Sequence, residues 1–292
     1  MPELPEVEHV VRGLRPHVLN EEIINVAFSE AVINGKAQGK ETIIKQVPLD
    51  TFNVMVSKSK IDLIERRSKY IIFHLVNQSE GNKIYLVGHL GMAGAFFVRP
   101  SIDDIPIPNF KKHWHVVFTL SNGQKMIYSD IRRFGEFKIM DESAFQLFNQ
   151  AIAPEPFTED AMHHFISKTK EKKYMNKPIK QVIMDHSVVS GCGNIYACEA
   201  LFLAKILPTH ITETLSTQKK KKLFSAIVEV LNKGIHYGGS SISDYRNVNG
   251  QSGQMQNKFN IYGLKHCKTC GSAVSNLVIA TRNTHYCEKC QK

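Results

Sequence analysis

Apolar and polar residues alternate along much of the first 140 positions, which is the pattern of strands that bury one face. The runs are short, contain many β-branched residues and are separated by turn-forming residues. The last two runs flank Ser121-Asn122-Gly123, and Asn-Gly between two such runs indicates a hairpin. The pattern predicts strands over 23–28, 51–56, 61–66, 70–75, 83–87, 114–120 and 124–129.

A helix is expected before the first strand. Leu4, Val7, Val11 and Leu14 recur at helical spacing, and Pro5 suits a first helical turn. The first half of the chain is therefore predicted to be a β-sandwich or barrel-like sheet with a helix packed on it.

From about residue 157 the apolar spacing becomes helical, which predicts helices over 159–168, 177–184, 195–205 and 217–236. Ala153-Pro154-Glu155-Pro156 is stiff and suits a linker. Residues 238–253 are rich in Gly, Ser and Asn without periodicity, so we expect a long loop that is functional or disordered. The chain is thus predicted to be α+β in four parts: a sandwich over 1–140, a linker over 141–157, a helical domain over 158–262 and a metal-binding hairpin over 263–292.

Charge narrows the class of partner. The 292 residues include 37 Lys+Arg and 27 Asp+Glu, a formal net charge of +10. Such an excess favours a polyanion, either nucleic acid or an anionic membrane surface. No apolar run reaches the roughly 18 residues of a spanning helix, and the acidic N-terminus lacks the apolar run of a signal peptide. We therefore expect a cytoplasmic protein.

The strongest chemical motif lies at the C-terminus. Cys267, Cys270, Cys287 and Cys290 form two C-x2-C pairs separated by 16 residues. Each pair can chelate through one tight turn, and four thiolates complete a tetrahedral zinc site. Four ligands leave no open position, so the predicted zinc ion is structural. Cys192 and Cys198 do not fit this spacing and are expected to be ordinary thiols.

The N-terminus offers a candidate nucleophile. Removal of Met1 would leave a secondary amine at Pro2, and an α-amino group titrates near pH ~8. Amines form Schiff bases with carbonyl carbons, and Glu3 is placed to move protons. The simpler interpretation of these residues is a helix start, in which Glu6 and Glu8 complement the helix dipole.

Three turns carry further candidates. Asp130-Ile131-Arg132-Arg133-Phe134-Gly135 places two cations beside an aromatic ring, which can grip phosphate and wedge between bases. Ser190-Gly191-Cys192-Gly193-Asn194 precedes a helix, with Asn194 as a suitable N-cap for a phosphate-binding helix start. His89-Leu90-Gly91-Met92-Ala93-Gly94 is an apolar turn that says little alone.

In this order the motifs resemble one family, the formamidopyrimidine-DNA glycosylases with the related endonuclease VIII enzymes, over nearly the whole chain. The N-terminus resembles the formamidopyrimidine branch. Three segments depart from the family pattern by one residue each, with Ser68 for Gly in R-R-G-K-Y, Ala93 for Ser in H-L-G-M-S-G and Ile131 for Pro in D-P-R-R-F-G. The other matching segments are Pro154-Glu155-Pro156, the helix–two-turns–helix motif from Met184 to Phe202, and the zinc hairpin.

The resemblance implies a role for each matching residue. Pro2 would attack C1′ of the damaged nucleotide, and Glu3 would protonate and deprotonate the sugar. Phosphates around the flipped nucleotide would be held by Lys69, Asn194 and Arg282. The hole in the duplex would be filled by Met92, Arg132 and Phe134, with Arg133 beside them. Glu6 and Lys180 are further candidates near the lesion, and residues 239–253 would cover the flipped base.

The implied protein is a bifunctional DNA glycosylase and AP lyase with one structural zinc ion. We expect it to bind double-stranded DNA as a monomer in the bacterial cytoplasm, associated with the nucleoid. The expected lesion is an oxidised purine opposite cytosine, with backbone amides near residues 243–245 facing O6 of the purine. Two alternatives stay open: an endonuclease VIII-like preference for oxidised pyrimidines, and a zinc-ribbon DNA-binding protein without catalysis.

Overall fold

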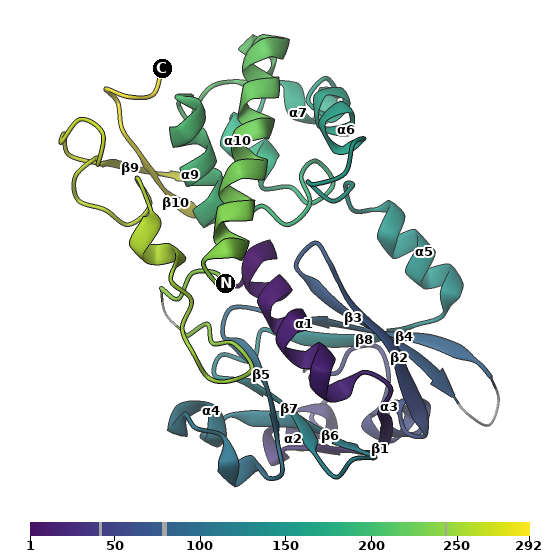
Figure 1. The fold of residues 1–292 in the computed structure, drawn as a ribbon. Helices are drawn as coiled ribbons and strands as arrows, with labels where there is room; N and C mark the ends of the chain where they lie inside the picture. Colours follow the sequence, from purple (N-terminus) through teal and green to yellow (C-terminus); the bar gives the residue numbers. More distant parts are fainter. Residues whose placement is uncertain (41–42, 78–80, 243) are drawn as a thin grey trace. The chain divides into compact units, whose positions relative to one another are not determined.

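The computed structural model describes residues 1–40, 43–77, 81–242 and 244–292, and these form two compact units (Figure 1). The first unit comprises residues 1–149 and 238–253, and the second comprises 150–237 and 254–292. Residues 238–253, predicted within the helical range, thus belong to the same unit as the N-terminus.

Eight antiparallel strands in one hydrogen-bonded series build the first unit, in the order β5-β7-β6-β1-β2-β3-β4-β8. The predicted hairpin is confirmed: Gly123 turns with φ +80° between β6 and β7. The strands are β1 (Glu22–Phe28), β2 (Ser59–Arg67), β3 (Tyr70–Asn77), β4 (Lys83–His89), β5 (Gly94–Arg99), β6 (Trp114–Leu120), β7 (Lys125–Asp130) and β8 (Glu136–Met140).

The series folds over onto itself. Phe137 lies on β8 at one end, yet its ring contacts three rings from the strands at the other end. The ring centroids of Phe96, Phe118 and Tyr128 lie 5.9, 5.8 and 5.0 Å from that of Phe137. Because strands far apart in the hydrogen-bonded order meet through their inner faces, the unit is the predicted β-sandwich.

Helix α1 (Leu4–Val18) packs on this sandwich as predicted, and it buries Leu4, Val7, Val11 and Leu14. The strand predicted over 51–56 is wrong, because this segment is helix α3 (Leu49–Val56). Phe52 is buried there together with a valine four residues later, so one helical face meets the core despite the β-branched composition. The other helices of the unit are α2 (Glu30–Ala37), η1 (Ile102–Asp104), α4 (Pro108–Lys112) and α5 (Glu142–Gln150).

Helix α5 lies inside the segment predicted as a linker. It is held on the sandwich by Phe145, whose ring stacks on Tyr85 of β4 at a centroid distance of 3.9 Å. Only the Pro-containing part of the predicted linker, after residue 150, is irregular.

The second unit is helical, and its predicted helices are confirmed, with the ends of all but 217–236 shifted. Helices α9 and α10 pack against one another in opposite directions, and the rings of Phe165 and Phe224 join α6 to α10 at 5.4 Å (Figure 1). The helices are α6 (Ala161–Lys168), α7 (Lys172–Met175), α8 (Ile179–Ile183), α9 (Asn194–Ala204), η2 (Thr212–Thr214), α10 (Thr217–His236) and η3 (Met255–Lys258).

A two-stranded hairpin of β9 (Ser275–Ile279) and β10 (Arg282–Tyr286) ends the second unit. Buried Cys198 and Phe202 of α9 pack against the cysteine cluster beneath this hairpin. None of the helices that the structure describes is long and apolar enough to cross a membrane.

Candidate active site and nucleic-acid interface

The start of α1 is buried, and its two carboxylates accept hydrogen bonds from backbone N–H groups. Glu3 occupies the N-cap and forms a capping box with Glu6, whose Oε2 accepts the Glu3 N–H at 2.8 Å. Both carboxylates are 2% exposed, and Pro2 beside them is buried as well. The segment is therefore a helix start, as the simpler interpretation has it. The same hydrogen bonds also fix the position of Glu3, which the implied chemistry requires.

The segment 238–253 is tied to this helix start. Oε1 of Glu6 accepts hydrogen bonds from the backbone N–H and the hydroxyl of Ser240, at 2.6 and 3.1 Å. Gly239 has φ +77°, and a Cβ there would lie 2.9 Å from Cγ of Glu6, so only glycine fits. Burial, followed by the charge of Glu6, raises the pKa of Tyr245 in the same segment. Residue 243, named in the expectation for the lesion-covering amides, lies outside the described residues.

Lys69 lies in the turn between β2 and β3, half-buried. The turn requires a left-handed residue, and Ser68 takes φ +57° where the family pattern has glycine. Arg66 secures it: its guanidinium donates to the Ser68 carbonyl at 3.1 Å and to Oε2 of Glu8 at 2.8 Å. Burial opposes ionisation of Glu8, but the hydrogen bonds and charges of the neighbouring arginines prevail and lower its pKa. The turn that carries Lys69 is thus linked to α1.

The turn after β7, called the wedge turn below, carries Arg132 and Phe134, the residues predicted to act as a wedge. Asp130 is fully buried, and its carboxylate accepts the N–H of Arg132 at 3.0 Å and that of Gly135 at 2.7 Å. The Tyr128 hydroxyl donates to the same carboxylate at 3.2 Å. Phe134 between these anchors is 59% exposed, with the guanidinium carbon of Arg132 5.2 Å from its ring centroid. The hydrogen bonds of Asp130 therefore fix a turn that exposes an aromatic ring and a cation.

The turn of Met92 is locked against the wedge turn. A Cβ on Gly91 would lie 2.4 Å from the backbone of Gly135, and a Cβ on Gly135 would lie 1.7 Å from the Tyr128 hydroxyl. Both positions must therefore be glycine. Met92, half-buried, thus lies on the segment that packs against the wedge turn.

Arg133, the other arginine of the wedge turn, lines a cavity. It adopts φ +56°, and the cavity, of about 450 Å³, is also lined by Arg132 and Lys40. Of the described residues that line this cavity, none carries a carboxylate. Their cations suit an anion such as a phosphate group.

In the second unit, Lys180 and Asn194 meet. Lys180 is fully buried, and its ammonium donates to Oδ1 of Asn194 at 2.5 Å. Nδ2 of Asn194 donates to the carbonyl of Asn283 on β10 at 2.9 Å. The predicted N-cap role of Asn194 is wrong, because Gly193 is the N-cap and Asn194 is the first helical residue. The amide instead links the start of α9 to the hairpin.

Glu199 is a structural residue of the second unit that was not predicted from the sequence. This fully buried carboxylate of α9 accepts the backbone N–H groups of Asn260, Ile261 and Tyr262 at 2.8 to 3.1 Å. It holds the chain at the point where it enters the zinc hairpin. Its signal in the sequence was an acidic residue inside an otherwise apolar helix.

Arg282 begins β10 and is exposed. The turn before it contains two left-handed residues, Ala280 at φ +49° and Thr281 at φ +61°. Since non-glycine residues are strained in this region, the turn must be held by the hairpin on which it lies. The guanidinium and the Lys180–Asn194 pair therefore lie in the same unit, linked through the hairpin.

The four predicted zinc ligands converge. Their Sγ atoms all lie within 4.8 Å of one another, with Cys267 and Cys290 3.8 Å apart and Cys270 and Cys287 3.5 Å apart. Thiolates at the Zn–S distance of about 2.3 Å in a tetrahedron lie roughly 3.8 Å apart. The donor set and its spacing thus fit a structural zinc ion, as predicted.

Comparison with known proteins agrees with this geometry. A family model described as the formamidopyrimidine-DNA glycosylase N-terminal domain matches residues 1–137, and one described as the H2TH domain of the same glycosylase matches 152–246. The chain belongs to the formamidopyrimidine-DNA glycosylase family. A member from Streptococcus pyogenes, named formamidopyrimidine-DNA glycosylase, is 36% identical over 298 residues, which cover 100% of this chain and 99% of that protein.

Solved members of the formamidopyrimidine-DNA glycosylase family share the fold. A Lactococcus lactis point mutant in complex with Fapy-dG-containing DNA matches with a TM-score of 0.84 at 31% identity, covering 100% of both chains. The wild-type L. lactis protein with DNA containing an oxidised pyrimidine gives 0.82 at 30% identity and the same coverage. The predicted α+β class, with a sandwich, a helical H2TH domain and a cysteine cluster, is thereby confirmed.

Proposed function

We propose that this protein excises oxidised purines from double-stranded DNA and then nicks the strand, with Pro2 as nucleophile. Membership in the glycosylase family confirms the enzyme class and the DNA partner. The observation that carries the residue assignment is the buried start of α1, where the capping box with Glu6 holds Glu3 and the adjacent Pro2 is buried.

The reaction uses the N-terminal amine. Its lone pair forms a bond to C1′ of the nucleotide while the glycosidic bond breaks and the base leaves with the bonding electrons and a proton. Glu3 transfers protons at the sugar, a contribution typically of about 10²–10⁴-fold. Protonation of O4′ by Glu3 then breaks the C1′–O4′ bond and leaves a protonated Schiff base between Pro2 and C1′. This Schiff base acidifies C2′, and loss of a C2′ proton expels the 3′ phosphate and breaks the strand.

Base removal also requires an emptied position in the duplex. Rotating a nucleotide out of the stack costs a few kcal/mol, and side chains that occupy the gap offset part of this loss. Met92, Arg132 and Phe134 are proposed to do so, because their two turns are locked together by Gly91 and Gly135. A guanidinium at this place can donate to O2 and N3 of the orphaned cytosine.

Phosphate contacts fall to both units in this proposal. Lys69 belongs to the first unit, while Lys180, Asn194 and Arg282 belong to the second. The zinc-bound cysteines would hold the hairpin that carries Arg282, and the metal supplies folding energy rather than chemistry. We further propose a monomer that acts in the bacterial cytoplasm, on the nucleoid.

A second candidate substrate is an oxidised pyrimidine, because a family member with this fold was crystallised with such DNA. The segment 238–253 favours purines. In its described part, the Ser240 N–H donates to Glu6 and both Ser240 and Tyr245 are buried, so these residues can border a flipped purine.

The deciding experiment is borohydride trapping on duplexes that contain 8-oxoguanine, combined with intact-mass analysis of the trapped protein. While Met1 is attached, the Pro2 nitrogen is a tertiary amide and cannot form a Schiff base. We expect trapped protein to lack Met1 and to favour 8-oxoguanine opposite cytosine over adenine. Full activity in protein that retains Met1 would refute the mechanism, and faster excision of an oxidised pyrimidine would favour the second candidate.

A further inference from the structure

The second unit carries positive charge that the proposed site does not use. It holds 18 Lys+Arg and 9 Asp+Glu, so 18 − 9 = +9 of the net +10 falls there. Lysines gather at the end of α6, in the turn that follows it, on α7 and in the first turns of α10. We call the exposed members the lysine face: Lys170, Lys172, Lys173, Lys219, Lys221 and Lys222.

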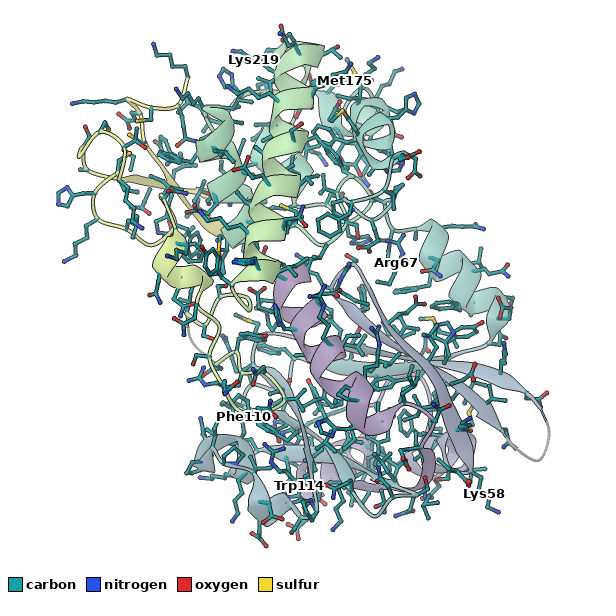
Figure 2. All side chains as sticks on the ribbon, in the orientation of Figure 1. Lys58, Arg67, Phe110, Trp114, Met175 and Lys219 are labelled. Atoms are coloured by element: carbon teal, nitrogen blue, oxygen red, sulfur yellow. The ribbon has the colours of Figure 1, made fainter. Side chains whose placement is uncertain are left out.

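Residues far apart in the sequence form this face. The contact of Phe165 with Phe224 at 5.4 Å brings the end of α6 beside the start of α10. The pKa of buried Lys220 is lowered first by burial and next by the positive charge of Lys170, with Glu213 opposing. The two lysine runs therefore face each other, and Figure 2 marks this end of the unit with Lys219 and Met175.

The stability of α10 does not explain why lysines cluster at its start. Lys219 to Lys222 lie in the first turns of α10, where the helix dipole disfavours cations, and that turn has no acidic residue. Two ion pairs occur here: Lys168, beside the lysine face, pairs with Glu171 at 2.9 Å, and Lys173 of the face pairs with Asp185 at 3.7 Å. Within the described parts of the chain, no ion pair reaches the other five members of the lysine face. Uncompensated like charges of this kind favour an external polyanion.

The lysine face is separate from the Asn194 cluster. Asn194 begins α9, and the chain then returns through residues 205–216 into α10, so the face lies at the other end of the helix pair. The 11 residues of α9 correspond to about 16 Å at 1.5 Å per residue. A phosphate bound at Asn194 therefore does not occupy the lysine face.

We propose that the lysine face binds the phosphate backbone of undamaged duplex DNA, without sequence preference. The inference rests on the proposed function only in taking DNA as the partner. Single-stranded nucleic acid is usually bound through exposed aromatic rings, whereas the one aromatic residue of α7, Tyr174, is 2% exposed. Membrane-surface helices place large apolar residues beside their cations, and no exposed large hydrophobic residue is found on α6, α7 or α10 among the described residues.

The test compares two triple variants of the full-length protein. The first variant replaces Lys172, Lys219 and Lys222 with Gln and so removes three charges from the lysine face. The second variant is the matched control. It replaces Lys60, Lys83 and Lys125 with Gln and so removes three charges from the sandwich. Binding of each to a 30-base-pair undamaged duplex is followed by fluorescence anisotropy between about 50 and 200 mM salt.

Each neutralised phosphate contributes about −0.9 to the slope of log affinity against log salt. We expect the lysine-face variant to flatten the slope by about two to three, while the control keeps the parent slope within one. Equal slopes in the two variants would overturn the proposal. Unchanged duplex binding with lost binding to single-stranded RNA or to phosphatidylserine vesicles would overturn it as well.

Single-turnover excision from a lesion duplex of about 12 base pairs, at saturating enzyme, separates this inference from the proposed function. The lysine-face variant should excise at the parent rate, because its change affects encounter rather than chemistry. A parent protein that does not excise would refute the proposed function, while the anisotropy comparison would still decide the lysine face.

Discussion

The two units differ most in how they carry charge. The first holds 19 Lys+Arg and 18 Asp+Glu, a net charge of +1, whereas the second holds nearly all of the excess. In the first unit individual carboxylates are buried and bonded to backbone N–H groups, as at Glu6 and Asp130. In the second, cations are exposed in numbers. The first unit therefore holds its charges in near balance, whereas the second unit has buried carboxylates such as Glu199 as well but also an excess of cations that favours a polyanion.

The largest expected effect separates chemistry from affinity inside the first unit. Glu3→Gln should lower base excision by about 10²–10⁴-fold, because the sugar loses its proton-transfer group. Cleavage of preformed abasic sites should persist in part, and duplex affinity should stay at the parent value. Single-turnover assays on both substrates check this, and excision at the parent rate would assign Glu3 a purely structural role at the helix start.

Removing one metal ligand tests the second unit. Cys290→Ser should lose zinc and DNA affinity together, because structural zinc contributes folding energy to the hairpin that presents Arg282. Elemental analysis and anisotropy measure the two losses. Cys192→Ser is the control, since Cys192 is buried away from the cluster's four thiols. A parent protein without zinc would contradict the assignment.

The wedge turn gives an effect of intermediate size. Asp130→Asn keeps the volume but leaves only one acceptor oxygen for the N–H groups of Arg132 and Gly135. We expect excision of an intact lesion to fall about tenfold, while cleavage of an abasic site changes little, because a preformed abasic site leaves no base to excise. Tyr128→Phe removes one donor to the same carboxylate and should give a smaller loss. Equal losses on both substrates would indicate general misfolding.

Acid should weaken the first unit through His89. Burial lowers the pKa of His89 to about 4, and its Nδ1 accepts the Gly91 N–H at 3.1 Å. The unfolded chain binds this proton more readily, so the stability from the neutral ring is present above pH ~6.5 and is lost as pH falls towards 4. Denaturant unfolding across this range should show a loss of up to about 3 kcal/mol, since one pKa unit corresponds to about 1.4 kcal/mol, and the loss should be smaller in His89→Gln. An identical pH profile in the variant would exclude His89 as the cause.

The smallest effect concerns a departure from the family pattern. Ser68→Gly should stabilise the turn before Lys69 by roughly 1 kcal/mol, because serine is strained at φ +57° and glycine is not. Thermal unfolding measures the gain, and duplex affinity should be unchanged. A loss of stability would mean that the Ser68 side chain makes a compensating contact.

Much of the protein follows from the sequence alone. The spacing of four cysteines determined the metal site, because each C-x2-C pair is a local chelate that needs only one turn. The alternation of apolar residues determined most strands, and the spacing of Leu4, Val7, Val11 and Leu14 determined α1. Asn-Gly fixed the hairpin, since its conformational preference is local. The family motifs named Pro2 and Glu3 by their order in the chain.

Other features were decided only by the tertiary structure. The segment 49–56 became a helix because one of its faces meets the core, against its β-branched composition. The bonds of Glu6 to Ser240, and of Glu199 to the chain entering the zinc hairpin, join residues 234 and 61–63 positions apart. The lysine face likewise needed α6 and α10 to pack together. The donors of a buried carboxylate, and the residues that share a charged surface, are brought together by tertiary contacts between distant segments. A local pattern of residues does not determine these contacts.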